Sequence, residues 1–176
     1  MYTLKNQKQM KKFLLIFIMI LGLSSCDNKE TTNSVYIQGG GTLDDWANLS
    51  KYKESNKILM SEIDENRVVF MGNSITEGWS NFDPDFFIRN PYVNRGISGQ
   101  TTPQMLIRFK PDVVNLKPKS VVILAGINDI AGNTGPMKIE NIAENIFSIS
   151  EIAKSNNIEV LIDRIAIKRS LKNRLT

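Results

Sequence analysis

Four short segments rich in apolar and β-branched residues, alternating with helical patterns, constrain this sequence most. The pattern predicts strands at 67–71, 92–94, 120–125 and 158–162. Strands that are apolar throughout and alternate with helices indicate a parallel sheet covered on both faces. The predicted fold class is therefore α/β, a three-layer α/β/α arrangement with a flavodoxin-like parallel sheet.

Helical spacing of apolar residues fills the intervals between these strands. Isoleucines recur at helical spacing within 139–154, which predicts an amphipathic helix. A second helix is predicted over 102–109, with Thr101 or Thr102 as its cap, and a short one over 74–79. Trp46, Leu49 and Tyr52 share a helical spacing, so a further helix is expected over about 42–59. Residues 81–91 are expected to form a loop with a partly helical stretch.

Three polar, glycine-containing segments each follow one of the predicted strands. They are 72–74, 96–99 and 126–129. Functional groups of open parallel sheets gather at the carboxyl ends of the strands. We therefore expect these three segments to meet at one edge of the sheet.

Ser74 stands at a predicted turn from strand to helix. A serine placed there can present its hydroxyl to a substrate, and its backbone N–H at the helix N-terminus can help hold an oxyanion. Serine is also a good helix cap, which is the commoner explanation for a lone serine. The segment is not G-x-S-x-G, because Thr76 stands where the second glycine belongs, and this disfavours the α/β-hydrolase family proper.

Gly99 and Asn128 lie in the other two segments. A glycine lets a backbone N–H approach a substrate oxygen, and an asparagine amide can donate to an oxyanion. Taken singly, each has a plainer explanation, a tight turn for the glycine and a loop residue bonded to local backbone for the asparagine. Together with Ser74 they predict three oxyanion donors at one edge.

The same segments resemble the conserved blocks of the SGNH/GDSL hydrolases. Residues 67–76, 94–102 and 126–129 are similar to the first, second and third blocks, with Asn73 replacing the aspartate of the GDS signature. The resemblance covers about 42–162. It implies a serine esterase or acylhydrolase that cleaves acyl or acetyl esters, with Ser74 as nucleophile and Ser74, Gly99 and Asn128 as oxyanion donors. It implies no metal and no organic cofactor.

The sequence departs from that family in having no histidine. The resemblance implies a D-x-x-H block after a fifth strand, followed by a final helix, and none of these is recognisable in the basic tail at 163–176. We expect a truncated domain, through a frameshift or premature stop in the gene or the sequence record. A serine is a poor nucleophile without an adjacent base, and no lysine adjoins the three segments in sequence.

Activity is therefore expected to be absent or weak in this chain. Two alternatives to a hydrolase stay open. One is a non-catalytic lipoprotein that binds an acylated ligand, and the other is an inert truncation product.

The first residues have the pattern of a secretory leader. Lys11 and Lys12 precede an apolar run of 11 residues, 13–23, which is too short to span a bilayer. The run ends at Cys26 in a pattern that resembles the lipobox of bacterial lipoproteins. A simple signal peptide with a chance cysteine and a buried N-terminal helix are the alternatives. We predict a signal peptide at 1–25, lipidation of Cys26, a flexible tether at 26–41, and an exported protein anchored to a bacterial membrane, either periplasmic or surface-facing.

Charge and cysteine content exclude several other classes of protein. The chain has a net charge of +4, but residues 1–25 and 163–176 each carry +4, so the body at 26–162 carries −4. A nucleic-acid-binding body is expected to be basic, which excludes that partner class here. One cysteine permits no internal disulfide, and one cysteine without histidine makes a structural zinc site implausible.

Overall fold

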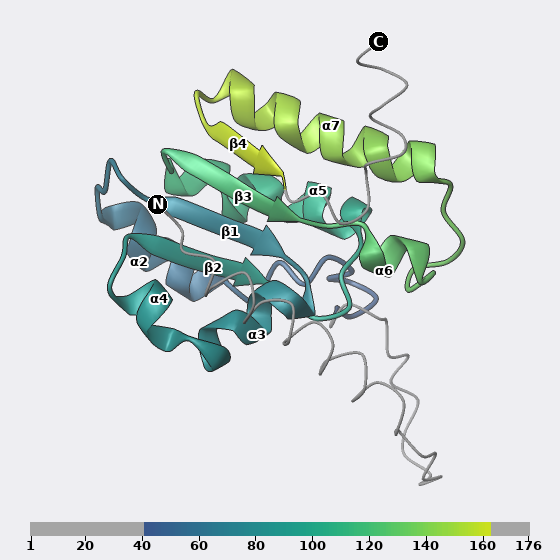
Figure 1. Cartoon of the computed structure of the whole chain (residues 1–176), viewed down its shortest axis with the longest axis horizontal. Coiled ribbons are helices and arrows are strands. Elements are labelled where there is room, and N and C mark those ends of the chain that lie inside the picture. Colours follow the sequence, from purple (N-terminus) through teal and green to yellow (C-terminus); the bar gives the residue numbers. More distant parts are fainter. Residues whose placement is uncertain (1–40, 163–176) are drawn as a thin grey trace, which may run out of the picture. The chain divides into compact units, whose positions relative to one another are not determined.

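The computed structural model describes residues 41–162. Its four strands are parallel and form one sheet in the order β2-β1-β3-β4 (Figure 1). The strands are β1 Val68–Gly72, β2 Tyr92–Gly96, β3 Ser120–Leu124 and β4 Glu159–Ile162. This order confirms the predicted α/β class and the predicted parallel sheet.

Helices occupy the connections between the strands. They are α2 Lys53–Ser61, α3 Ser74–Phe82, α4 Pro84–Ile88, α5 Thr102–Asp112, α6 Ile127–Ile130 and α7 Ile139–Ser155, with a short 3-10 turn at Val114–Leu116. The start of each of three helices follows from its cap. Asn73 accepts the Ile75 N–H at 3.0 Å, Asp83 caps α4, and a capping box at Thr101 begins α5.

The two faces of the sheet are covered by different helices (Figure 1). Val69 and Met71 of β1 point to the face under α5 and α7, where the apolar core lies. Phe70, between them in sequence, points to the other face. There it packs against an aromatic cluster from α3, α4 and the start of β2, comprising Trp79, Phe86, Phe87 and Tyr92. The period of two in β1 therefore produces the three layers.

Within residues 41–162, β2 and β4 are the edge strands. Leu161 of β4 pairs with Val122 of β3 and shares the face of Phe70. Leu161 is 48% exposed and Val122 is half-buried. Among the described residues, the part of the sheet near β4 is thus less well covered than the part under the aromatic cluster.

The prediction of a helix over about 42–59 is wrong for the first half of that range. Residues 43–52 form turns, and α2 begins only at Lys53. The reason is the Asp45 carboxylate, which accepts the backbone N–H groups of Leu49 at 2.7 Å and Ser50 at 2.9 Å. These bonds offer the backbone an alternative to the helix. The regular spacing of the aromatic residues therefore comes from a series of turns that pack on the body, and not from a helix.

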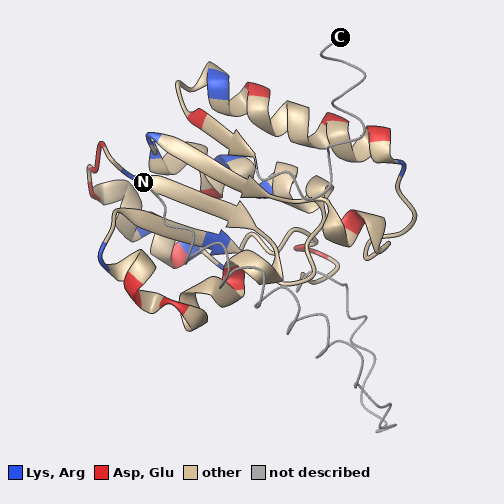
Figure 2. Ribbon diagram, viewed as in Figure 1, with Lys and Arg blue, Asp and Glu red and all other residues tan. Residues whose placement is uncertain are grey.

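Charged side chains are nearly absent from the strands and lie mostly on helices and loops (Figure 2). The exceptions are Arg95 in β2 and Glu159 in β4. In the described part of the chain, no helix is long and apolar enough to cross a membrane. The predicted leader, Cys26, the tether up to residue 40 and the tail at 163–176 lie outside the described residues.

Candidate active site

The three predicted site segments follow strand ends that are aligned in register. Gly72 at the end of β1 pairs with Gly96 of β2 on one side and with Leu124 of β3 on the other. The Ile97 N–H then donates to the Gly72 carbonyl at 3.0 Å, which extends the pairing beyond the strands. Ser74, Gly99 and Asn128 lie two, three and four residues past these aligned positions. The structure thus brings the three segments to the same edge of the sheet, as predicted.

Ser74 is the first residue of α3 and is half-buried. Two glycines let this helix approach the strand ends closely. A Cβ at Gly72 would lie 2.0 Å from the Thr76 hydroxyl, and a Cβ at Gly96 would lie 2.2 Å from the Glu77 backbone nitrogen. Close packing of α3 on β1 and β2 therefore fixes where the N-terminus of the helix, with Ser74, lies.

Asn73, which precedes Ser74, is fully buried. Its side-chain oxygen caps α3, but its Nδ2 has no hydrogen-bond partner in the structure. The amide is therefore held by its oxygen alone.

Gly99 has a φ of 79°, in the left-handed region that favours glycine. The turn around it is held on both sides. The Gln100 N–H donates to the Ile97 carbonyl at 3.3 Å, and Asn133 Nδ2 donates to the Gly99 carbonyl at 2.9 Å. Gly99 thus does form a tight turn, as the plainer explanation predicted. It does not conflict with a role for the Gly99 N–H as an oxyanion donor.

Asn128 is the second residue of α6, and the N-cap of that helix is Gly126, whose φ is 104°. Its Nδ2 donates to the Gln100 carbonyl at 2.9 Å. An amide nitrogen has two hydrogens, so this bond orients the group and leaves a second hydrogen for a ligand. The neighbouring Asp129 is buried and accepts the Thr102 N–H at 2.9 Å, which ties the loop after β3 to the start of α5.

A buried polar network beneath this edge escaped the sequence analysis. Arg108 of α5 is fully buried and forms an ion pair with Asp112 at 2.9 Å. Burial lowers the pKa of Arg108, and the charge of Asp112 opposes that effect. Arg108 also bonds Gln100 and the Gly72 carbonyl. The available signal was a polar residue between Met105 and Phe109 on the buried side of an amphipathic helix.

The turns at 43–52 lie against the same edge. Gln100 Nε2 donates to the Ala47 carbonyl at 2.7 Å, and Gln104 Nε2 donates to the Trp46 carbonyl at 2.9 Å. The Tyr52 hydroxyl donates to the Gly96 carbonyl. Burial raises the pKa of Tyr52 to about 12, with a further contribution from the negative charge of Glu77. The phenol therefore keeps its proton and remains a donor.

Glu77, one helical turn after Ser74, connects α3 to the Gly99 turn. Its carboxylate accepts both the backbone N–H of Ser98, at 2.7 Å, and the Ser98 hydroxyl. Lys51, from the turns at 43–52, forms an ion pair with the same carboxylate. A lysine distant in sequence thus comes near the site, which sequence adjacency could not reveal. A lysine base must be desolvated and unprotonated, whereas Lys51 is paired with an acid.

Glu77 is expected to make the fold sensitive to acid. Burial alone would raise the pKa of Glu77, but hydrogen bonds from Lys51 and Ser98, with the Lys51 charge, outweigh it and lower that pKa. A carboxyl group whose pKa is depressed in the folded state stabilises the protein at pH values above its unfolded-state pKa of about 4.3. This stabilisation is lost as the pH falls through the folded-state pKa. Urea unfolding from pH 7 to pH 3 should therefore show Glu77→Gln converging on the wild type as the pH falls. Parallel curves would contradict this assignment.

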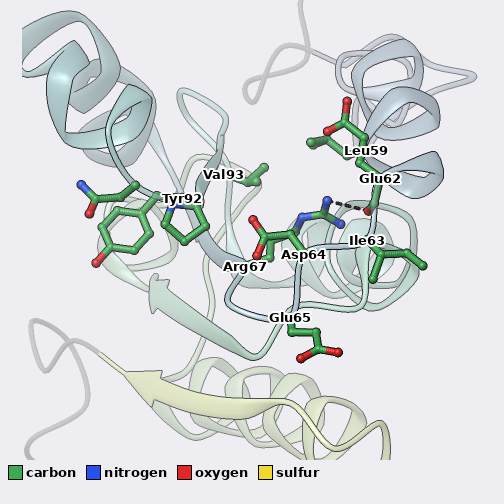
Figure 3. A pocket seen from close by; sticks show the side chains of 10 residues that line it. Leu59, Glu62, Ile63, Asp64, Glu65, Arg67, Tyr92 and Val93 are labelled. Atoms are coloured by element: carbon green, nitrogen blue, oxygen red, sulfur yellow. Dashed lines mark hydrogen bonds between the residues drawn. The ribbon is translucent and has the colours of Figure 1, made fainter.

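Two hollows lie at the opposite edge of the sheet. One, of about 480 Å³, is lined by residues near the starts of β1 and β2, including Arg67, Asp64 and Tyr92 (Figure 3). The other, of about 580 Å³, is lined by residues that precede β3 and β4. Neither is lined by a predicted site residue. Among residues 41–162, no group of three acidic, cysteine or histidine side chains is placed to hold a metal ion.

Comparison with known proteins identifies the family. A model of the GDSL-like lipase/acylhydrolase family matches residues 70–171, more than half of the 176 residues. The chain therefore belongs to this family of ester hydrolases, which confirms the resemblance found in the sequence.

Two solved structures are similar to the chain over most of the described residues. A GDSL-like lipase of Bacteroides thetaiotaomicron is 51% identical, with a TM-score of 0.64, over 66% of this chain and 57% of the relative. A candidate acylhydrolase of Bacteroides fragilis is 45% identical, with a TM-score of 0.64, over 74% and 71%. The chain thus spans little more than half the length of the first relative.

A third similarity is short. A stretch of 39 residues is 49% identical to YqeF of Bacillus subtilis, an uncharacterized lipoprotein, and covers 22% of this chain and 16% of that protein.

Proposed function

We propose that this chain carries the nucleophile and the oxyanion-binding groups of an acyl-ester hydrolase. The observation that carries the proposal is the alignment of Gly72, Gly96 and Leu124, which places the three site segments side by side. Membership of the GDSL-like family supports the same chemistry. The substrate class is a small acyl or acetyl ester, and no cofactor is needed.

We infer the following chemistry for the three site segments. The Ser74 oxygen attacks the acyl carbon, and the carbonyl oxygen becomes an oxyanion that accepts hydrogen bonds from the Ser74 N–H, the Gly99 N–H and Asn128 Nδ2. Collapse of this intermediate expels the alcohol and leaves an acyl group on Ser74, which water then removes. Preorganised donors of this kind are worth about 10²–10³ in rate each.

The proton of the Ser74 hydroxyl needs a base, and the 176 residues contain no histidine. Loss of the histidine or serine in a well-studied serine protease costs about 10⁶ in kcat and leaves about 10³–10⁴ over the uncatalysed rate. The expected hydrolytic rate of this chain alone is correspondingly low. The missing base also favours the second candidate function, in which the same groups bind an acylated ligand without cleaving it.

Free imidazole should restore part of the reaction. With p-nitrophenyl acetate and 2-methylimidazole, the wild-type chain is expected to hydrolyse the ester faster than Ser74→Ala under identical conditions. The gap should grow with imidazole concentration, because a general base contributes about 10²–10⁴ to such reactions. The measurement is the initial rate of nitrophenolate release in the two proteins, corrected for imidazole alone.

Equal rates in the two proteins at every imidazole concentration would exclude Ser74 as a nucleophile. A folded wild-type chain that shows equal rates but gains thermal stability from an acetylated ligand would favour the binding function. Asn128→Ala is a useful companion variant, because it should lower the Ser74-dependent rate without removing the nucleophile.

We further propose that the protein is exported and anchored to a bacterial membrane through a lipidated Cys26. The apolar run before this cysteine and the polar stretch after it support the proposal. The partial similarity to a protein named as a lipoprotein adds to that support. More than one acyl chain is needed for stable anchoring, so a fully modified cysteine is expected.

A further inference from the structure

One buried side chain contacts the first of the three site segments and the residue that directly follows the second. The guanidinium of Arg108 is 0% exposed. It donates to the Gly72 carbonyl at 3.1 Å, two residues before Ser74, and to the side-chain oxygen of Gln100, directly after Gly99. Its third partner is Asp112, at 2.9 Å, which balances its charge.

Gln100 extends this connection to the third segment. The residue is fully buried, and each of its four polar groups has a partner. Its side-chain oxygen accepts from Arg108, and its Nε2 donates to the Ala47 carbonyl. Its N–H donates to the Ile97 carbonyl, and its carbonyl accepts from Asn128 Nδ2 at 2.9 Å. Gly99 therefore precedes Gln100 directly, and Asn128 bonds it. Ser74 lies two residues after Gly72, whose carbonyl accepts from Arg108.

We propose that Arg108, acting through Gln100, is the positioning residue that holds Ser74, Gly99 and Asn128 in one oxyanion-binding arrangement. This rests on the proposed function, because it assigns a role within that same site. Arg108 does not touch the substrate. Its planar guanidinium donates in several fixed directions at once, which a lysine ammonium cannot reproduce at the same atoms. Supporting residues of this kind hold the hydrogen-bond donors close to the positions in which they can stabilise an oxyanion.

The chain offers a matched control for burial alone. Arg67 is 4% exposed and donates to the Leu116 and Glu62 carbonyls at 2.6 Å and 2.9 Å. It lies just before β1, at the edge of the sheet opposite the strand ends that lead to the site segments, and Figure 3 shows its bond to Glu62. Arg67→Lys and Arg108→Lys should both destabilise the fold, because both replace a buried, hydrogen-bonded guanidinium. Only Arg108→Lys should alter the candidate site.

The test uses two readouts on the full chain. The first is the affinity for phenylboronic acid, whose boron accepts the Ser74 oxygen and becomes tetrahedral and negative while the hydroxyl proton passes to the buffer. The second, which needs no ligand, is the NMR chemical shift of the Gly99 backbone amide and of the Asn128 side-chain amide. Urea unfolding establishes the conditions in which each variant is folded.

Arg108→Lys is expected to weaken phenylboronic acid binding roughly 10- to 100-fold and to shift both amide signals. Arg67→Lys is expected to leave affinity and signals unchanged, because distant sites act independently. The proposal is overturned if folded Arg108→Lys retains wild-type affinity and signals, or if Arg67→Lys shows the same losses. Failure of the wild type to bind the probe, or binding that survives Ser74→Ala, counts against the proposed function instead, while the amide shifts still decide the role of Arg108.

A second pair of variants covers the case in which Arg108→Lys does not fold. Gln100→Met removes the side-chain amide that accepts from Arg108 and leaves the ion pair with Asp112 intact. Gln104→Met is its control, because Gln104 is equally buried and also bonds the turns at 43–52, through the Trp46 carbonyl. Shifts of the Asn128 and Gly99 signals in Gln100→Met alone support the proposal, and equal shifts in both variants refute it.

Discussion

Changing Asp112 to asparagine is expected to lower the free energy of unfolding by about 3–5 kcal/mol. Asp112 is 1% exposed and its partner Arg108 is 0% exposed, so the substitution leaves a charged guanidinium without its counter-ion in a site closed to water. Asp112 also accepts Asn56 Nδ2 at 2.7 Å, and that bond must be rearranged. Urea unfolding followed by circular dichroism measures the loss, a large share of the 5–15 kcal/mol typical of a domain.

Asp85→Asn is the matched control for this experiment. Asp85 and Arg89 also stand four residues apart on a helix, and their ionic atoms lie 2.8 Å apart, but their side chains are 60% and 75% exposed. An exposed pair of this kind contributes about 0.3–0.5 kcal/mol at most. A loss below about 1 kcal/mol in Asp112→Asn would mean that Arg108 reaches water or another acceptor when the carboxylate is neutralised.

Changing Gly96 to alanine is the second substitution with a large expected effect. The added Cβ would lie 2.2 Å from the backbone nitrogen of Glu77, a separation that no packed structure tolerates. Because the obstacle is backbone, α3 must move away from the strand ends, at a cost of about 1–3 kcal/mol or more. Ser74 moves with α3, so the Ser74-dependent rate in the presence of imidazole should fall together with stability.

Gly78→Ala should have the opposite effect on stability. Gly78 lies in the same helix, and no atom beyond the adjacent residues and backbone of that helix lies within 4 Å of the Cβ that alanine would add. Alanine is a better helix former than glycine by about 0.8–1 kcal/mol, so the protein should become more stable. Destabilisation by both variants would mean that an added methyl group disturbs the protein even where it has space, so the close contact at Gly96 would not account for the loss.

The elements whose signal is local were predictable from the sequence. Strand β3 is a run of apolar residues that follows Ser120, and α7 buries Ile142, Ile146 and Ile149 at the spacing that predicted it. The placement of the site segments followed from one general rule, because parallel strands end at the same edge. That rule needs only strand order and direction. It located the neighbourhoods of Ser74, Gly99 and Asn128 without any knowledge of their contacts.

The buried polar network was not predictable, because its partners are distant in sequence. Arg108 bonds the Gly72 carbonyl 36 residues away, and Gln100 bonds the Ala47 carbonyl 53 residues away. Arginine and glutamine are ordinarily exposed residues, so their burial becomes evident only from the fold. The turns at 43–52 were mistaken for a helix for a related reason. The Asp45 carboxylate accepts nearby backbone N–H groups and so competes with the helix. The spacing of apolar residues does not reveal this competition.

Because β4 runs parallel to β3, with Ile162 opposite Ile123, Ile162 lies at the edge of the sheet that carries Ser74. Gly41 lies near the same edge, since it packs on Trp46, whose carbonyl accepts from Gln104 in the first turn of α5. A fluorophore, affinity tag or solid support attached at a residue next to Gly41 or Ile162 is therefore expected to crowd the candidate site. The exposed Lys117 and Lys119, just before β3 at the far edge, are the better points for attachment.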